Sequence, residues 1–275
     1  MKAPAVDYVR PHSLTEAIER LAAANGEARV IAGGQSLVAM MNLRLAAPGL
    51  LSDIARLPEL TAVADDADAV ILGACVTHAA IEDERAPDPS RGLMPRVAST
   101  LAYRAIRTRG TIGGSLALSD PAAEWPAVLA ALDAEVTLLG PGGRRSFKCT
   151  EFTTGIFKTR LGGDEIIESV RIPKISAEAR WGYIKLCRKA GEFASALAAA
   201  VADHGRGHCR VVLGAVGGAP LVLDQTSQLV ATGGHQNLRD TVAADLDRGA
   251  DRHFDEFQRN LLTVAAMRAV QQVLQ

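Results

Sequence analysis

Two short glycine-rich segments are the residues whose types and spacing point most directly to chemistry. They read Ala32-Gly33-Gly34-Gln35-Ser36 and Thr111-Ile112-Gly113-Gly114-Ser115. Adjacent glycines permit positive φ angles and lack the Cβ atoms that would hold a ligand away, so successive N–H groups can converge on an anion. Each loop alone is simply interpreted as a tight turn. Their joint occurrence with matching layout favours a ligand that carries two linked phosphates.

Familiar nucleotide and metal motifs do not account for these loops. Neither loop matches GxGxxG, and no GxxxxGK followed by Ser or Thr occurs, so any dinucleotide binds in another fold than a Rossmann or P-loop domain. The four cysteines are scattered, and His204 and His208 beside Cys209 lie in a glycine-containing stretch that favours a loop. We therefore predict no metal site and no catalytic residue in this chain.

The composition narrows the classes of function. The chain has 275 residues with 30 Lys+Arg against 31 Asp+Glu, and this balance argues against nucleic acid or an anionic membrane as a partner. Hydrophobic residues make up 48%, which predicts a folded chain of one or two domains. No apolar run approaches the roughly 18 residues of a membrane span, and the start lacks an apolar signal core. We expect a cytoplasmic protein.

Periodicity predicts alternating helices and strands up to about residue 175. Ser13-Leu-Thr-Glu16 is a capping box before a helix from Leu14, and Ser36 is placed to cap a second helix. We expect strands at 28–32, 51–54, 70–74 and 165–172, a hairpin at 136–147, and helices from Thr77, over 95–106 and from Asp120 to Leu132.

The pattern changes after Pro173. Strands are predicted at 181–187, 209–216 and 221–223, an alanine-rich helix at 193–201, and a closing helix around 254–264. We therefore predict a first domain over 1–175, with subdomains of about 1–56 and 57–175, and a small C-terminal α+β domain over 176–275.

Three longer stretches resemble a known family. They are RVIAGGQSLVAMMNLRLA (29–46), IRTRGTIGGSLALSDPAAEWPAVLAALDA (106–134) and the weaker IKLCRKAGEF (184–193). The sequence is similar to the FAD-binding medium subunits of molybdenum hydroxylases of the carbon monoxide dehydrogenase and xanthine dehydrogenase type. The resemblance implies an α+β fold: a PCMH-type, vanillyl-alcohol-oxidase-like FAD-binding domain of two α/β subdomains, followed by the small C-terminal domain.

The resemblance also implies roles for individual residues. The FAD pyrophosphate would lie between residues 32–36 and 111–115, Asp120 would reach toward the ribose, and Leu161 would pack on the adenine. Lys185 would stand near the flavin edge, and Phe193, a tyrosine in familiar relatives, would lie against the isoalloxazine. Ser115 stands where many relatives have asparagine. From the residues alone, Asp120 is equally a helix cap, Lys185 an outward strand residue and Leu161 a core residue.

The function implied by the resemblance is electron transfer within a larger enzyme. A small partner subunit with 2Fe-2S clusters would pass electrons to FAD in this chain, and a large partner would bind the molybdopterin cofactor and substrate. The expected assembly is a heterotrimer, paired into a dimer of heterotrimers, that delivers electrons to an external acceptor. The alternatives are a self-contained flavin oxidoreductase of the vanillyl-alcohol oxidase fold and a nucleotide-binding sensor.

Overall fold

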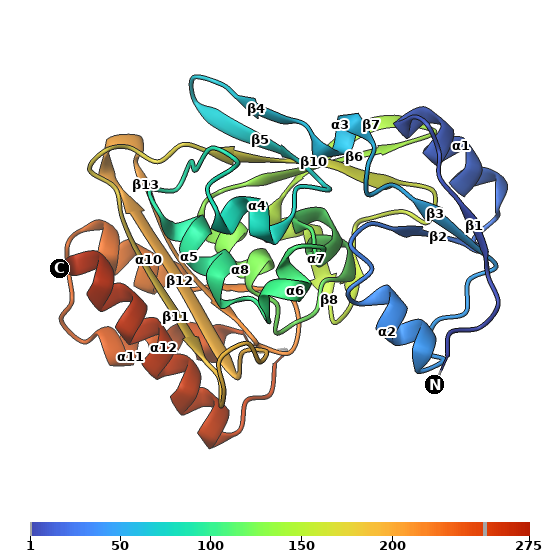
Figure 1. Cartoon of the computed structure of the whole chain (residues 1–275). Coiled ribbons are helices and arrows are strands. Elements are labelled where there is room, and N and C mark those ends of the chain that lie inside the picture. Colours follow the sequence, from blue (N-terminus) through green and yellow to red (C-terminus); the bar gives the residue numbers. More distant parts are fainter. Residues whose placement is uncertain (1, 250–251) are drawn as a thin grey trace.

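The structure of the protein is a computed structural model that describes residues 2–249 and 252–275. Within these residues the chain forms three larger sheets and a two-stranded one, and the larger sheets follow one another in sequence (Figure 1). Helices lie around and between the sheets (Figure 1). The predicted α+β class is confirmed.

A small parallel sheet with the order β1-β3-β2 forms the N-terminal part. It contains β1 (Asp7–Val9), β2 (Ala28–Ile31) and β3 (Leu50–Asp53), with α1 (Leu14–Ala23) before β2 and α2 (Leu37–Asn42) after it. Helix α1 begins as predicted, because the Ser13 hydroxyl accepts a hydrogen bond from the Glu16 N–H at 3.1 Å. Its buried residues are those of the predicted apolar face: Leu14, Ala17, Ile18 and Leu21.

A five-stranded antiparallel sheet follows, in the order β4-β5-β10-β6-β7. Its strands are β4 (Val63–Asp65), β5 (Ala69–Gly73), β6 (Glu135–Gly140), β7 (Gly143–Lys148) and β10 (Ile166–Pro173). The helices of this part are α3 (Pro58–Thr61), α4 (His78–Glu82), α5 (Leu93–Thr100), α6 (Arg104–Arg107), α7 (Ile112–Leu118), α8 (Glu124–Ala131) and α9 (Cys149–Phe152). The two-stranded sheet pairs β8 (Thr153–Gly155) with β9 (Lys158–Thr159).

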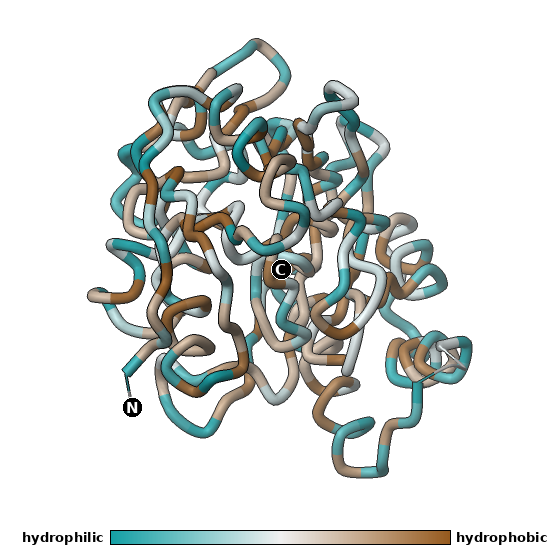
Figure 2. The backbone as a smooth tube through the Cα atoms, turned by 90° about the vertical axis from the view of Figure 1, so that its right-hand side faces the viewer, coloured by the Kyte–Doolittle hydropathy of each residue, from teal (hydrophilic) through white to brown (hydrophobic). Residues whose placement is uncertain are grey.

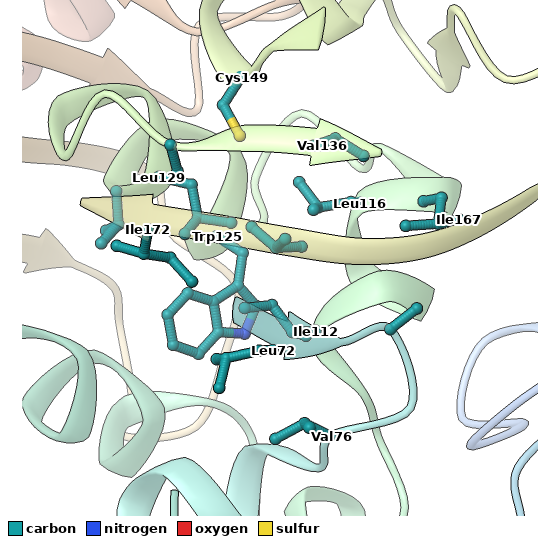
Figure 3. Packing of buried hydrophobic residues seen from close by; sticks show 14 of the residues in the cluster. Leu72, Val76, Ile112, Leu116, Trp125, Leu129, Val136, Cys149, Ile167 and Ile172 are labelled. Atoms are coloured by element: carbon teal, nitrogen blue, oxygen red, sulfur yellow. The ribbon is translucent and has the colours of Figure 1, made fainter. Parts of the chain in front are cut away.

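The core of this part surrounds Trp125, which is fully buried. Figure 3 shows its indole among Leu72, Ile112 and Ile172, which come from a strand, a helix and another strand. Burying apolar side chains of this size contributes about 1.5–3 kcal/mol each, so this cluster ties the helices to the sheet.

Two helices differ from the predicted ranges. The expected helix over 95–106 is two helices, α5 and α6, because Leu101 is extended and Ala102 has a φ of +38°. The expected helix from Asp120 begins only at Glu124, since Ala123 is extended and residues 120–123 form a turn. Pro126 then occupies the first turn of α8, where its missing N–H costs no helical hydrogen bond.

The C-terminal part is a four-stranded antiparallel sheet with helices on both faces. The order is β11-β12-β13-β14, from β11 (Arg180–Leu186), β12 (Ala196–Asp203), β13 (His208–Gly214) and β14 (Leu221–Val222), with the short helix η1 (His204–Arg206) before β13. The helices that follow are α10 (Asp224–Ala231), α11 (Leu238–Arg248) and α12 (Glu256–Leu274). Helix α12 packs on β11 and β12, and α8 packs on β12 and β13 (Figure 1).

The predicted alanine-rich helix over 193–201 is wrong, because that segment supplies strand β12. All eight residues of β12 are buried. Ala196, Ala198 and Ala200 belong to the cluster that includes α12, whereas Leu197 and Ala199 belong to the Trp125 cluster. A strand covered on both faces lacks the polar alternation that marks an ordinary strand, so its apolar run was mistaken for a helix. The small alanines let both helices approach the sheet closely.

The backbone tube in Figure 2 shows hydrophobic and hydrophilic segments alternating along the chain, with hydrophilic segments at many outer turns. Along the described residues, none of the helices has both the length and the apolar character needed to cross a membrane.

Candidate cofactor site

The first glycine loop contacts the residues directly before the second loop. The first loop follows β2, and the second leads from α6 into α7. A Cβ atom built on Gly33 would lie 2.1 Å from the Arg109 carbonyl oxygen and 2.8 Å from the Cα of Gly110, where ordinary contacts are 3.4–4 Å. Only glycine at position 33 therefore lets the first loop approach the residues directly before the second loop.

The first loop presents unused backbone donors. Gly34 has a φ of +71°, and the Gln35 side-chain amide donates to the Gly33 carbonyl at 2.9 Å, which folds the loop on itself. Among the described residues, no protein group accepts a hydrogen bond from the backbone N–H of Gly33, Gly34, Gln35 or Ser36. Ser36 occupies the cap position of α2 as predicted, but its hydroxyl makes no cap hydrogen bond. These groups are available to an anionic ligand.

The second loop uses most of its N–H groups within the protein. Ile112 and Gly113 donate to the carbonyl oxygens of residues 76 and 74, at 3.0 and 2.9 Å. The Gly114 N–H donates to the Thr111 hydroxyl at 3.0 Å, which caps α7. That hydroxyl keeps its own hydrogen as a donor. This loop therefore offers hydroxyl groups and a surface without bulky side chains, rather than a row of free N–H groups.

A cavity of about 720 Å³ lies between the two loops and extends to the C-terminal part of the chain. Twelve of the fourteen predicted site residues line it: Ala32, Gly33, Gly34, Gln35, Ser36, Thr111, Gly113, Gly114, Ser115, Asp120, Leu161 and Phe193. The volume falls within the range of about 300–1,000 Å³ for small-molecule and cofactor sites.

Ile112 and Lys185 are the two predicted residues that do not line the cavity. Ile112 is fully buried in the core beneath the second loop. The Lys185 ammonium donates to a Glu124 carboxylate oxygen at 2.6 Å and to the Thr100 carbonyl at 3.0 Å. Both side chains of this ion pair are at least 94% buried, and Glu124, not Lys185, reaches the cavity. The charge of Lys185 is therefore paired within the protein, and its place near the flavin edge stays a prediction.

Burial raises the pKa of the Glu124 carboxyl, and the Lys185 ammonium opposes that rise. The pair places two opposite charges side by side, so this wall of the cavity carries no net charge from them.

The sequence family described as "FAD binding domain in molybdopterin dehydrogenase" matches residues 4–175. The chain belongs to this family. It is 38% identical over 219 residues to the nicotine 6-hydroxylase medium subunit of Paenarthrobacter nicotinovorans, which covers 80% of this chain and 76% of the relative. It is 35% identical over 198 residues to the carbon monoxide dehydrogenase medium chain of Hydrogenophaga pseudoflava, and the alignment covers 72% of this chain and 69% of the relative.

The fold agrees with this membership. The structure of reconstituted CO dehydrogenase from Oligotropha carboxidovorans superposes with a TM-score of 0.92 at 28% identity, over 100% of this chain and 99% of the other. The chain is thus an FAD-binding medium subunit of the molybdenum hydroxylase family, and an oxidoreductase subunit, as the sequence predicted.

The residues present fit FAD. A dinucleotide needs donors for its diphosphate and apolar walls for its two ring systems. The unbonded N–H groups of the first loop and the Ser36, Thr111 and Ser115 hydroxyls supply the donors, and most of the exposed cavity surface is apolar. The cavity therefore supplies both the hydrogen-bond donors and the apolar surface that FAD requires.

Two exposed aromatic residues line the cavity. Phe193 is 63% exposed and Tyr103 is 65% exposed, and both line the cavity. Gly191 has a φ of +85°, and a Cβ there would lie 2.8 Å from the Ala102 carbonyl oxygen. This close approach brings the segment of Phe193 against the segment of Tyr103, so residues about ninety positions apart share the rim.

Asp120 and Leu161 both line the cavity, and each also makes contacts within the protein. One Asp120 carboxylate oxygen accepts from the Ala122 N–H at 2.9 Å and stabilises the turn before α8. It does not cap that helix, whose cap residue is Ala123. The second oxygen accepts from no described residue and is available to a ligand hydroxyl. Leu161 packs partly against the core and partly lines the cavity, and its contact with the adenine stays a prediction.

Among the lining residues that sequence reasoning missed are His78, Tyr103 and Glu124. Each lies outside the glycine loops. Glu124 follows Asp120 by four positions and could have been found as a second acidic residue near the loop. His78 and Tyr103 become visible only once the fold joins them to the loops.

No group of three or more His, Cys, Asp or Glu side chains is arranged to hold a metal ion in the described part of the chain. His208, one of the residues considered for a metal, instead bonds the Ala131 carbonyl through Nε2 at 2.8 Å.

Proposed function

We propose that this chain is the flavoprotein subunit of a heterotrimeric molybdenum hydroxylase. It would accept electrons from the 2Fe-2S clusters of a small subunit and pass them to an external acceptor, while a large subunit carries the molybdopterin cofactor and the substrate site. The observation that carries the proposal is the cavity lined by both glycine loops, with free N–H donors and two exposed aromatic residues in its lining. The names "medium subunit" and "medium chain" of the relatives support a multi-subunit assembly.

FAD, when bound, supplies a centre that accepts electrons one at a time and releases them as a pair. The residues of this chain bind and orient it. The first loop would donate to the diphosphate, the free oxygen of Asp120 would accept from a ribose hydroxyl, and Leu161 would pack on the adenine. Phe193 would lie against the ring system at the rim and limit its contact with water. The Glu124–Lys185 pair would hold this wall rigid.

The division into domains supports the same proposal. We propose an FAD-binding domain over 1–175, of subdomains 1–56 and 57–175, and a C-terminal domain over 176–275. The parallel sheet ends at Asp53, the antiparallel sheet at Pro173, and the last sheet begins at Arg180. The cavity would then lie where all three units meet, since its lining includes residues from each range.

Coexpression tests the electron route. The chain purified alone should bind one FAD, and the reconstituted complex should reduce that flavin when its substrate is added, whereas the chain alone should not. Native mass spectrometry of the complex would also measure the proposed dimer of heterotrimers. Flavin reduction by substrate in the isolated chain would instead support a self-contained flavin oxidoreductase. Bound FAD that stays oxidised in the complete, substrate-treated complex would support a sensor.

A further inference from the structure

His78 lies in the wall of the FAD cavity without an assigned role. It is the first residue of α4, whose cap residue Thr77 accepts from the Ala80 N–H at 3.1 Å. The His78 backbone N–H donates to the Gly110 carbonyl at 2.9 Å, and Thr77 pairs with Thr111 in an isolated bridge. These contacts fix the histidine directly beneath the start of the second loop. Its side chain is 6% exposed and lines the cavity.

A buried tryptophan determines which ring nitrogen of His78 carries the hydrogen. The Trp125 indole N–H, which can only donate, lies 3.1 Å from His78 Nδ1. Nδ1 must therefore be the acceptor, and the hydrogen of the neutral ring resides on Nε2. Burial, with a smaller contribution from the Arg107 charge, lowers the pKa of His78 to about 4. The ring is thus uncharged at neutral pH and donates through Nε2.

The donor atom faces the region of the glycine loops. A Cβ on Gly110 would lie 2.8 Å from His78 Cδ2 and 3.0 Å from Nε2, so the ring edge occupies the space that a side chain at 110 would fill. No acceptor for Nε2 occurs among the described residues. Nε2 is also not one of the described polar atoms that are sealed from solvent without a partner, which are Ser52 Oγ and Arg252 Nη1. Nε2 therefore keeps some exposed surface, in a residue that lines the cavity.

We propose that the His78 Nε2–H donates a hydrogen bond to an oxygen or ring nitrogen of bound FAD, and that Trp125 is the positioning residue that holds this tautomer. The proposal deepens the proposed function and depends on FAD being the ligand of this cavity. An uncharged donor strengthens binding without adding net charge to a wall where Glu124 and Lys185 already neutralise each other. His78 is then a cofactor-binding residue outside both glycine loops.

Two amide substitutions separate the two ring nitrogens. In His78→Asn the amide reaches the place of Nδ1 and retains an acceptor for Trp125, but it loses the donor at Nε2. In His78→Gln the amide reaches the place of Nε2 and retains the donor, but it leaves the indole N–H of Trp125 without its partner. The two variants should therefore behave oppositely in cofactor affinity and in stability.

The assays are titration of the apoprotein with FAD, followed by flavin fluorescence, and thermal unfolding of the apoprotein. We expect His78→Asn to raise the Kd for FAD about 2- to 10-fold, the range of one net hydrogen bond, with little change in Tm. His78→Gln should keep the Kd within about twofold and lower the Tm, because a buried donor loses its acceptor. A wild-type Kd in His78→Asn, or equal weakening in both variants, overturns the proposal.

A measurement on the unsubstituted protein keeps the test decisive if a variant does not fold. Nitrogen-15 NMR of the histidine side chains should find His78 with its hydrogen on Nε2 and should find that resonance shifted when FAD is added. An Nδ1-protonated ring, or an Nε2–H resonance unmoved by saturating FAD, overturns the proposal. Failure of the unsubstituted protein to bind FAD at all would instead overturn the proposed function.

Discussion

Replacing Gly33 with alanine tests whether contact between the two loops shapes the FAD site. The added methyl carbon would lie 2.1 Å from the Arg109 carbonyl oxygen, more than an ångström closer than ordinary contact, and the Arg109 carbonyl carbon would be 2.6 Å away. Both obstacles are backbone atoms, so no side-chain rotation relieves the clash. The first loop must move away from the second.

Overpacking of this kind costs about 1–3 kcal/mol. If the loops part to relieve it, the donors of the first loop leave their positions and the Kd for FAD should rise about 5- to 150-fold. The assay is titration of the apoprotein by flavin fluorescence, with thermal unfolding in parallel to detect any general loss of structure.

Gly142→Ala is the matched control. Gly142 lies in the turn between β6 and β7, has no atom within 4 Å of a built Cβ and lacks a left-handed φ. The Gly142→Ala protein should therefore keep a Kd for FAD and a Tm near those of the unsubstituted protein. A Gly33→Ala protein that binds FAD as tightly as the control would refute the inference that this close contact determines the geometry of the site.

Three further predictions address the walls of the cavity. Lys185→Met leaves the buried Glu124 carboxylate without its partner and should lower the free energy of unfolding by about 3–5 kcal/mol in urea titrations, whereas exposed Lys158→Met should leave it unchanged. Because the pKa of His78 is about 4 in the folded chain and 6.5 when exposed, the unfolded chain takes up the proton first as the pH falls. The contribution of neutral His78 to the free energy of unfolding is therefore fully present above about pH 6.5 and declines by about 3 kcal/mol toward pH 4. In urea titrations between pH 6.5 and pH 4, the His78→Asn protein should lack this decline. Phe193→Ala should weaken FAD binding about 2- to 12-fold through lost stacking, while the Tm barely changes. The control is Phe257→Ala, at a residue that is 72% exposed and outside the cavity lining, and it should change neither the Kd nor the Tm. Equal FAD affinity in both variants would contradict the role of Phe193.

The sequence predicted those helices and strands whose capping residues and apolar spacing are visible in neighbouring residues. The capping box at Ser13 and the spacing from Leu14 to Leu21 placed α1, because a helix that covers a core on one side repeats its apolar residues every three or four positions. Segment β12 lacks such a signal. Alanine has the highest helix propensity, and only burial between α8 and α12 makes the segment a strand.

The cofactor site likewise combines features that can be predicted from the sequence with features that depend on the fold. Glycines at 33, 34, 113 and 114 mark places where the backbone must approach something closely, and that requirement is readable in the residues themselves. What each glycine approaches is not readable: Gly33 meets the backbone of Arg109, and Gly113 meets Ala74 at the end of β5. Likewise, Lys185 is visible as a cation in a strand, but its neutralisation by Glu124, sixty-one positions earlier, depends on the packing of β11 near α8.

The sequence by itself determined the family, the α+β class and the two glycine loops, because motifs and periodicity are properties of neighbouring residues. Tertiary structure alone decided that Gly33 meets the backbone of Arg109, that the alanine-rich segment is a strand, that Lys185 is paired, and that the Trp125 indole donates to His78. Each of these features depends on contacts between residues far apart in the chain. Such contacts stabilise the protein only after folding has brought the residues together and excluded water from between them.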